Sequence, residues 1–277
     1  EISACLVGSE MCIRDRVSVE EAGSGDFERG LTVLVPAAEK DADLLELCLG
    51  SVREHLAGQR HEVWVVAPES EVLRAVCAEA GVRFVLEDEV LPVRAKELRT
   101  RGWVIQQLIK LNAWRHVPTE DYLVLDADTV FLRKQVFFRG GRTVLRYADQ
   151  YELLYERSLT MVLGDRPRFP VSFVTHHMVM NRGIVESLLR QTGERLGAEW
   201  WDGLVRVIDA HSISPISFSE FDLYGNYVMN DPELRGRHVL EYWHGLDAPN
   251  RAPEEVLGAG EGRLAGLNSV SFHRHTQ

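Results

Sequence analysis

The chain has 277 residues, a formal net charge of −11 at pH 7, and 45% hydrophobic and 26% charged residues. This length can bury the core of one large α/β domain, and the composition is that of an ordinary globular protein. The acidic balance and the absence of a basic stripe in the sequence argue against a nucleic-acid partner.

Two further patterns bear on the cellular compartment. Cys48 and Cys77 fall within helical patterns and no Cys-x-x-Cys pair occurs, so we expect core thiols in a reducing compartment. No apolar run approaches the roughly 20 residues of a membrane span, and we expect no signal peptide. These patterns favour a cytoplasmic protein without a transmembrane segment and leave peripheral membrane association open.

Residues 1–30 carry no pattern of a fold. Residues 6–16 resemble translated sequencing-adapter sequence, and residues 20–26 have the polar composition of a disordered leader. We therefore expect residues 1–30 to be an adapter-derived artefact or a disordered leader, and residues 31–277 to form a single domain.

Strands and helices alternate between residues 31 and 87. Compact apolar runs predict buried strands at 31–36, 61–68 and 82–87, and helical spacing predicts helices at 43–56 and 71–80, the second ended by Gly81. Short connections imply a parallel sheet with helices on its faces. No Gly-x-Gly-x-x-Gly follows the first strand, so a dinucleotide-binding Rossmann domain is disfavoured.

A polar connection is expected at residues 87–92, and the helix expected at 102–114 has two unlike faces. One face is an apolar arc, and the other carries Trp103, Gln106, Gln107, Lys110 and Trp114. A solvated face normally carries charged residues rather than two tryptophans and two glutamines. We expect this face either to contact a ligand or to pack its tryptophans under a loop, with Lys110 reaching solvent.

The most informative stretch is an apolar strand at residues 122–125 that runs directly into Asp126-Ala127-Asp128. A second apolar run follows at 130–132. Two carboxylates at the end of a buried strand are costly to bury unpaired, and strand ends in α/β sheets are where ligands collect. The pattern indicates a cation site or a functional cleft, although an ordinary acidic turn has the same short sequence.

The order of elements becomes mixed after residue 132. The patterns predict strands at 142–147, 172–181, 238–243 and 268–275, helices at 151–163, 182–190, 196–208 and 218–230, and a loop at 253–266. Alternation along 172–181 puts His176 and His177 on opposite faces, so at most one of them lines a cleft. Asn181 and Ser219 are expected to cap the helices that follow them.

Four blocks in this order carry a resemblance to a known class. They are Gly102-Trp103 with Gln106-Gln107 and Lys110-Leu111, then residues 125–129, 176–178 and 219–226. With the strand–helix series before them, they resemble the GT-A class of nucleotide-sugar glycosyltransferases over roughly residues 31–275, and within it an uncharacterised bacterial glycosyltransferase-like family, DUF6492-like. The resemblance implies an α/β, GT-A-like fold with a mixed central sheet, in which a Rossmann-type nucleotide-binding half (31–132) is fused to an acceptor half (133–277).

The same resemblance implies a metal-dependent, hexosyltransferase-like enzyme of polysaccharide biosynthesis. Such an enzyme moves a sugar from a nucleotide-sugar, with a UDP-sugar as the favoured donor, to a hydroxyl of a glycan or small acceptor. The acidic pair of this class holds Mn²⁺ or Mg²⁺, which neutralises the departing diphosphate. We expect Asp128 as a direct ligand, Asp126 as a further ligand or ribose contact, and His273 as a third ligand, with His275 as its rival.

The remaining residues receive roles from the same resemblance. Val35 and Pro36 should border the nucleobase, Lys110 should reach the donor phosphates or sugar, and Gln106 and Gln107 should bond sugar hydroxyls. The acceptor should contact residues of the later blocks and of the helix face: Trp103, His176 and His177.

An inverting transfer needs a general base, and Glu220 and Asp222 are the candidates. Glu220 is preferred because Asp222 fits a helix cap. A retaining enzyme needs no such base, and the sequence leaves the stereochemistry open.

Three other classes are weighed against a glycosyltransferase. A nucleotidyltransferase shares the nucleotide-binding half but normally has a Gly-rich basic loop after the first strand, which residues 36–41 lack. A non-catalytic nucleotide-sugar-binding protein is disfavoured because both aspartates are present. A metal-dependent phosphohydrolase is disfavoured because no His-x-Asp or Asp-x-His cluster occurs.

Overall fold

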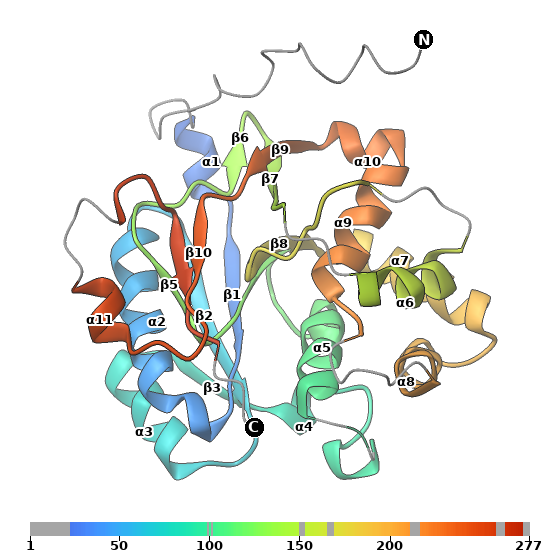
Figure 1. Ribbon diagram of the computed structural model, residues 1–277, viewed down its shortest axis with the longest axis horizontal. Coiled ribbons are helices and arrows are strands. Elements are labelled where there is room, and N and C mark those ends of the chain that lie inside the picture. The colour runs from blue at the N-terminus through green and yellow to red at the C-terminus, as the bar shows by residue number, and fades with distance from the viewer. Residues whose placement is uncertain are drawn as a thin grey trace.

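Five strands form a central sheet in the order β3-β2-β1-β4-β8 (Figure 1). Their bounds are β1 (Leu31–Pro36), β2 (His61–Ala67), β3 (Arg83–Leu86), β4 (Asp121–Leu125) and β8 (His177–Asn181). The first four are parallel and β8 runs antiparallel to β4. The computed structural model describes residues 23–98, 100, 102–149, 153–164, 169–210, 217–258 and 264–273. The expected α/β fold with a mixed central sheet is confirmed.

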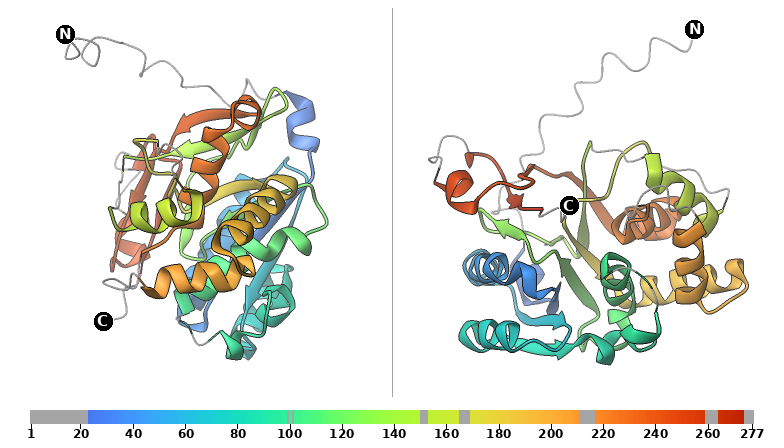
Figure 2. Two further views of the ribbon diagram at one scale, coloured as in Figure 1. Left: turned by 90° about the vertical axis from the view of Figure 1, so that its right-hand side faces the viewer. Right: turned by 60° about the horizontal axis from the view of Figure 1, so that its bottom comes forward.

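Helices cover both faces of this sheet (Figures 1 and 2). Successive residues of β1 and β4 are buried on opposite faces, as the alternation of a strand requires. Val33 and Leu123 pack in the cluster that holds α2 (Ala42–His55) and α3 (Glu71–Ala80). On the other face, Leu34 and Val124 share a cluster with a second set of helices. That set is α5 (Gly102–Asn112), α6 (Leu153–Leu163), α7 (Arg182–Leu196), α8 (Trp200–Ala210) and α9 (Glu220–Asn230).

Several helix ends are set by the residues that the sequence singled out. Asn181 accepts hydrogen bonds from the first backbone N–H groups of α7, and the Ser219 hydroxyl accepts one from Asp222 N–H in the first turn of α9. Gly81 ends α3 in the left-handed conformation, with φ of 68°. Cys48 and Cys77 are buried thiols, as expected.

Two smaller sheets flank the central one. The first has the order β10-β11-β5, from Gly245–Asp247, Ser269–Ser271 and Thr129–Phe131. The second has the order β6-β7-β9, from Phe138–Arg139, Arg142–Tyr147 and His238–Tyr242. Because β11 pairs antiparallel with β5, it lies beside the segment that directly follows Asp126 and Asp128.

The structure corrects the expected leader. Residues 24–28 form α1 (Ser24–Glu28), and the Asp26 carboxylate accepts hydrogen bonds from the N–H groups of Gly140 (2.8 Å) and Gly141 (3.0 Å). Arg29 pairs with buried Asp121 at 2.6 Å. The fold therefore begins before residue 31, and residues 1–22 lie outside the described part.

Other local expectations were also wrong. The expected polar connection at 87–92 contains α4 (Glu87–Val90), and the expected loop at 253–266 contains α11 (Pro253–Leu257). The strand expected at 172–181 begins only at residue 177, because His176 has a φ of 61° that interrupts the alternation.

The remaining short helices are α10 (Pro232–Gly236) and the 3₁₀ turns η2 (Glu39–Asp41), η3 (Ala95–Glu97) and η4 (Ala113–Arg115). Among the residues described, no helix combines the length and the apolar character needed to cross a membrane.

Candidate functional site

A cavity of about 550 Å³ opens at the carboxyl ends of β1 and β4. The chain passes from β1 outward through β2 and β3, then returns to the other side of β1 as β4. This reversal makes a crevice between β1 and β4, the position where open α/β sheets bind ligands. The volume lies within the roughly 300–1,000 Å³ of small-molecule sites.

Most of the side chains predicted for a site line this one cavity. They are Pro36, Trp103, Gln106, Gln107, Lys110, Asp126, Asp128, His176, Glu220 and His273. They come from the end of β1, the polar face of α5, the turn after β4, the residue before β8, the start of α9 and the residues after β11. Four residues of the polar face of α5 therefore line the cavity, which is the position needed for the expected ligand contact. Trp114 does not line it.

Three predicted residues do not line the cavity: Val35, Asp222 and His177, the last of which is described below. Val35 is fully buried in the core on the α2 side of the sheet. Asp222 is buried and accepts a hydrogen bond of 2.6 Å from the Phe173 N–H, so its carboxylate has a structural task. The ligand contact expected of Val35 and the catalytic role considered for Asp222 are corrected accordingly.

The side chains of the consecutive residues His176 and His177 lie in different surroundings. His176 lines the cavity, whereas His177 is buried between the rings of Phe131 and Phe137, at centroid distances of 5.1 and 6.3 Å. Burial and the neighbouring Arg146 guanidinium lower the pKa of His177 well below its usual value. His177 therefore cannot contact a ligand in the cavity, which corrects its expected acceptor role. His275 lies outside the described residues.

Lys110 joins the two carboxylates on the inner wall. Its Nζ lies 2.6 Å from Asp126 Oδ1 and 2.6 Å from Glu220 Oε1. Burial alone would lower the pKa of Lys110, but the two carboxylates raise it, so this residue stays cationic. The pKa of Asp126 is lowered because Lys110 and His176 outweigh the effect of burial. For Glu220 burial is the larger effect and its pKa is raised, although Lys110 opposes the shift.

The second carboxylate oxygen of Asp126 faces a histidine. His176 Nδ1 lies 3.4 Å from Asp126 Oδ2, and the imidazole also packs edge-on against Trp243 at 5.3 Å between ring centroids. Burial alone would lower the pKa of His176, but Asp126 and Asp247 raise it. The residue is thus oriented by an aspartate on one side and an indole on the other.

His273 has the same arrangement with the other aspartate. Its Nδ1 lies 3.2 Å from Asp128 Oδ2, and β11 brings it there by pairing with β5. Burial would lower the pKa of His273, but Asp128 and Asp247 raise it to about 10. Each aspartate of the pair therefore faces the Nδ1 atom of one histidine.

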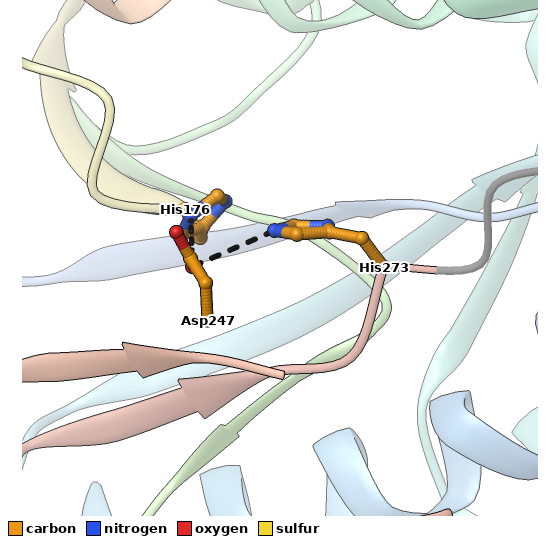
Figure 3. A group of neighbouring side chains, drawn as sticks. All are labelled: His176, Asp247 and His273. Atoms are coloured by element: carbon orange, nitrogen blue, oxygen red, sulfur yellow. Dashed lines mark ion pairs between the residues drawn. The ribbon is translucent and has the colours of Figure 1, made fainter. Parts of the chain in front are cut away.

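Asp247, at the end of β10, is a cavity residue that the sequence did not reveal. Its Oδ1 lies 3.0 Å from His176 Nε2 and 3.7 Å from His273 Nε2, and Figure 3 shows its carboxylate facing both imidazole rings. One ligand atom from each of these three residues lies within 4.8 Å of the others. Three-residue strand β10 has no periodicity that could have singled out this aspartate.

The donor atoms suit a divalent cation. Asp128 Oδ1 is buried and makes no hydrogen bond to any described residue, which is costly unless something else compensates. Two imidazole nitrogens and carboxylate oxygens form a mixed set that suits first-row divalent ions such as Mn²⁺. The residues present therefore fit a metal centre at this wall of the cavity.

Comparisons with known proteins place the chain in a family but give no activity. No curated protein matches the chain. A sequence model of the "Family of unknown function (DUF6492)" matches residues 32–260, which include β1, the two aspartates, His176, Glu220 and Asp247. The chain belongs to this DUF6492 family.

Proposed function

We propose that this protein is a metal-dependent glycosyltransferase that moves a sugar from a nucleotide-sugar, preferably a UDP-sugar, to a hydroxyl group of a glycan or small acceptor. One observation carries the proposal. Asp126 and Asp128 end β4 at the reversal of the sheet, opposite His273, in a cavity that also contains the cationic Lys110. A GT-A-like organisation of the chain is part of the same proposal.

The donor would lie across the ends of β1 and β4. Pro36 at the end of β1 would border the nucleobase, and Gln106 and Gln107 on α5 would bond hydroxyl groups of the sugar. Residues Asp126, Asp128, His176, Asp247 and His273 provide the candidate metal donors. A bound divalent cation would neutralise the negative charge that develops on the departing nucleoside diphosphate.

The acceptor would enter from the α5–α9 side of the cavity. Trp103 offers an aromatic surface for a sugar ring, and Glu220 is the candidate general base of an inverting transfer. Its raised pKa moves it toward neutral pH, where a general base works best. The base would accept the proton of the acceptor hydroxyl while the new glycosidic bond forms.

Lys110 supports both halves of this arrangement. Because its Nζ lies 2.6 Å from both Asp126 and Glu220, it holds the donor-side carboxylate and the candidate base at fixed positions. Because both carboxylates hold this ammonium group at hydrogen-bond distance, we assign Lys110 to positioning rather than to direct phosphate binding.

Thermal-shift measurements on the purified chain test the proposal. UDP-, GDP-, CMP- and dTDP-sugars are each added with and without Mn²⁺, and the Tm is compared with that of the metal-only sample. We expect at least one UDP-sugar to raise Tm only when Mn²⁺ is present. If no nucleotide-sugar changes Tm in the presence of metal, the proposal is wrong.

The nucleotide-sugar that raises Tm can then distinguish a transferase from a nucleotidyltransferase and from a non-catalytic binding protein. A nucleotidyltransferase would release pyrophosphate from a nucleoside triphosphate and a sugar phosphate, and a non-catalytic binding protein would release nothing. Metal-dependent release of the nucleoside diphosphate from the nucleotide-sugar, with Asp209→Asn on the exposed face of α8 as a matched control, supports a transferase.

A further inference from the structure

Asp126 and Asp128, which follow β4, each lie beside a different histidine rather than around a common point. Asp126 Oδ2 faces His176 Nδ1 at 3.4 Å, and Asp128 Oδ2 faces His273 Nδ1 at 3.2 Å. Histidines that bind metals commonly donate their other ring N–H to a carboxylate, which fixes the tautomer and the ring orientation. The chain contains this carboxylate–histidine arrangement twice, side by side.

The opposite nitrogens of both rings face a third carboxylate. His176 Nε2 and His273 Nε2 lie 3.0 and 3.7 Å from Asp247 Oδ1 (Figure 3). Ligand atoms bonded at about 2.1 Å are separated by about 3.0 Å in octahedral geometry and about 3.4 Å in tetrahedral geometry. The 3.0 Å separation equals the octahedral value and the 3.7 Å separation is slightly longer than the tetrahedral one, so a small movement of His273 would bring all three atoms to one ion.

We infer that His176, Asp247 and His273 form a two-histidine, one-carboxylate metal centre, and that Asp126 and Asp128 position the two histidines from the outer side. This assignment differs from the sequence prediction, in which the aspartates were direct ligands. Lys110 and Glu220 extend the outer layer, because Lys110 joins Asp126 to Glu220. A chain of contacts therefore links the candidate base to the metal ligand His176.

The ligand set predicts which cation is bound. Imidazole nitrogen is a good ligand for first-row transition ions, whereas Mg²⁺ prefers oxygen ligands and retains several waters. A centre with two imidazoles and one carboxylate should bind Mn²⁺ or Co²⁺ in the absence of any nucleotide and should select both over Mg²⁺. The part played by the ion in sugar transfer rests on the proposed function, but its binding does not.

Titration of Co²⁺ into the metal-stripped full chain tests this assignment, because ligation by protein nitrogen produces visible absorption bands that aqueous Co²⁺ lacks. The wild type should bind one Co²⁺. Because Mn²⁺ is the weaker ion at such a site, it should displace Co²⁺ only in large excess, and Mg²⁺ at the same excess should displace none. His176→Asn and Asp247→Ala should weaken binding at least about 100-fold, and Asp126→Asn and Asp128→Asn by about 10–100-fold. Asparagine is chosen at position 176 because it tolerates the positive φ found there.

Control measurements separate metal binding from folding. His244→Ala, at an exposed histidine that does not line the cavity, should bind Co²⁺ like the wild type. The Tm and circular dichroism of each variant without metal show whether it folds.

The assignment is overturned if folded His176→Asn and Asp247→Ala bind Co²⁺ like the wild type, or if Mg²⁺ displaces Co²⁺ as effectively as Mn²⁺ does. A chain that binds Co²⁺ as described but no nucleotide-sugar would contradict the proposed function alone.

Discussion

His273 Nδ1 lies 3.2 Å from Asp128 Oδ2, although the two residues are 145 positions apart in the chain. The backbone brings them together: the Phe272 N–H donates a 2.9 Å hydrogen bond to the Asp128 carbonyl, and β11 pairs with β5 directly after the two aspartates. Strand β11 therefore completes the wall of the cavity that holds the proposed metal ligands.

Replacing Phe272, the residue directly after β11, should lower stability and weaken metal binding. Phe272 is fully buried, so Phe272→Ala should lower the free energy of unfolding by about 3–5 kcal/mol. The shifted strand should also weaken Mn²⁺ binding, measured by calorimetry on the folded variant. Phe138→Ala removes an equally buried ring that does not line the cavity and should leave Mn²⁺ affinity unchanged. Equal Mn²⁺ affinity in both variants would contradict the role given to β11.

Lys110 should be essential for the carboxylate network. Its side chain is only 5% exposed, and Lys110→Met would leave Asp126 and Glu220 as uncompensated neighbouring charges. Breaking a buried pair in this way typically costs about 3–5 kcal/mol, measured by urea denaturation. Adding Glu220→Gln to Lys110→Met should recover part of the loss, and exposed Lys96→Met should have little effect. A wild-type denaturation midpoint for Lys110→Met would refute this account of the network.

Replacing the carboxylate by an amide should have different effects at Glu220 and at Asp222. Glu220→Gln removes the candidate base but leaves Lys110 paired with Asp126, so donor binding should persist while transfer falls at least about 100-fold. Asp222→Asn should instead lower the Tm, because the carboxylate that accepts from Phe173 N–H becomes a neutral amide. Unimpaired turnover of Glu220→Gln would eliminate it as the base. Enzymes that retain the anomeric configuration would give that result.

Asp26 should make stability depend on pH at the acidic end. Burial would raise its pKa, but hydrogen bonds from the N–H groups of Gly141, Gly140 and Gly23 lower it below the usual value. A lowered folded-state pKa contributes stability above the unfolded pKa of about 3.9, and this contribution is lost as the pH falls through the folded value. Asp26→Asn should therefore cost about 1–3 kcal/mol at pH 7.

Urea denaturation of both proteins between pH 7 and pH 3.5 checks this expectation. The difference between the wild type and Asp26→Asn should shrink as the pH falls toward and below 3.9. A difference that is constant over this range would show that the Asp26 charge contributes nothing.

Many of the elements that position the cavity could be predicted from the sequence. Apolar runs predicted β1 and β4 because both strands are buried on two faces. The two unlike faces of α5 indicated which of its residues line the cavity. Local capping chemistry located the starts of α7 and α9, because Asn181 and Ser219 act within their own first turns.

The geometry of the candidate site was not predictable in the same way. Asp247 lies on a strand of three residues, too short to show a period, and its neighbours in the site come from distant segments. The sequence indicated that at most one of His176 and His177 lines a cleft but not which one; His176, which has a positive φ, lines the cavity. The pairing of each aspartate with one histidine depends on β11 and β8 and leaves no local pattern.

Calorimetric titration of the UDP-sugar selected by thermal shift tests the central proposal most directly. We predict one binding site on the Mn²⁺-loaded chain, and an affinity at least about 10-fold lower on the chelator-treated chain, which corresponds to about 1.4 kcal/mol or more. His244→Ala should behave like the wild type. Equal affinity with and without metal, or no binding to the metal-loaded chain, would contradict a metal-dependent nucleotide-sugar site in this cavity.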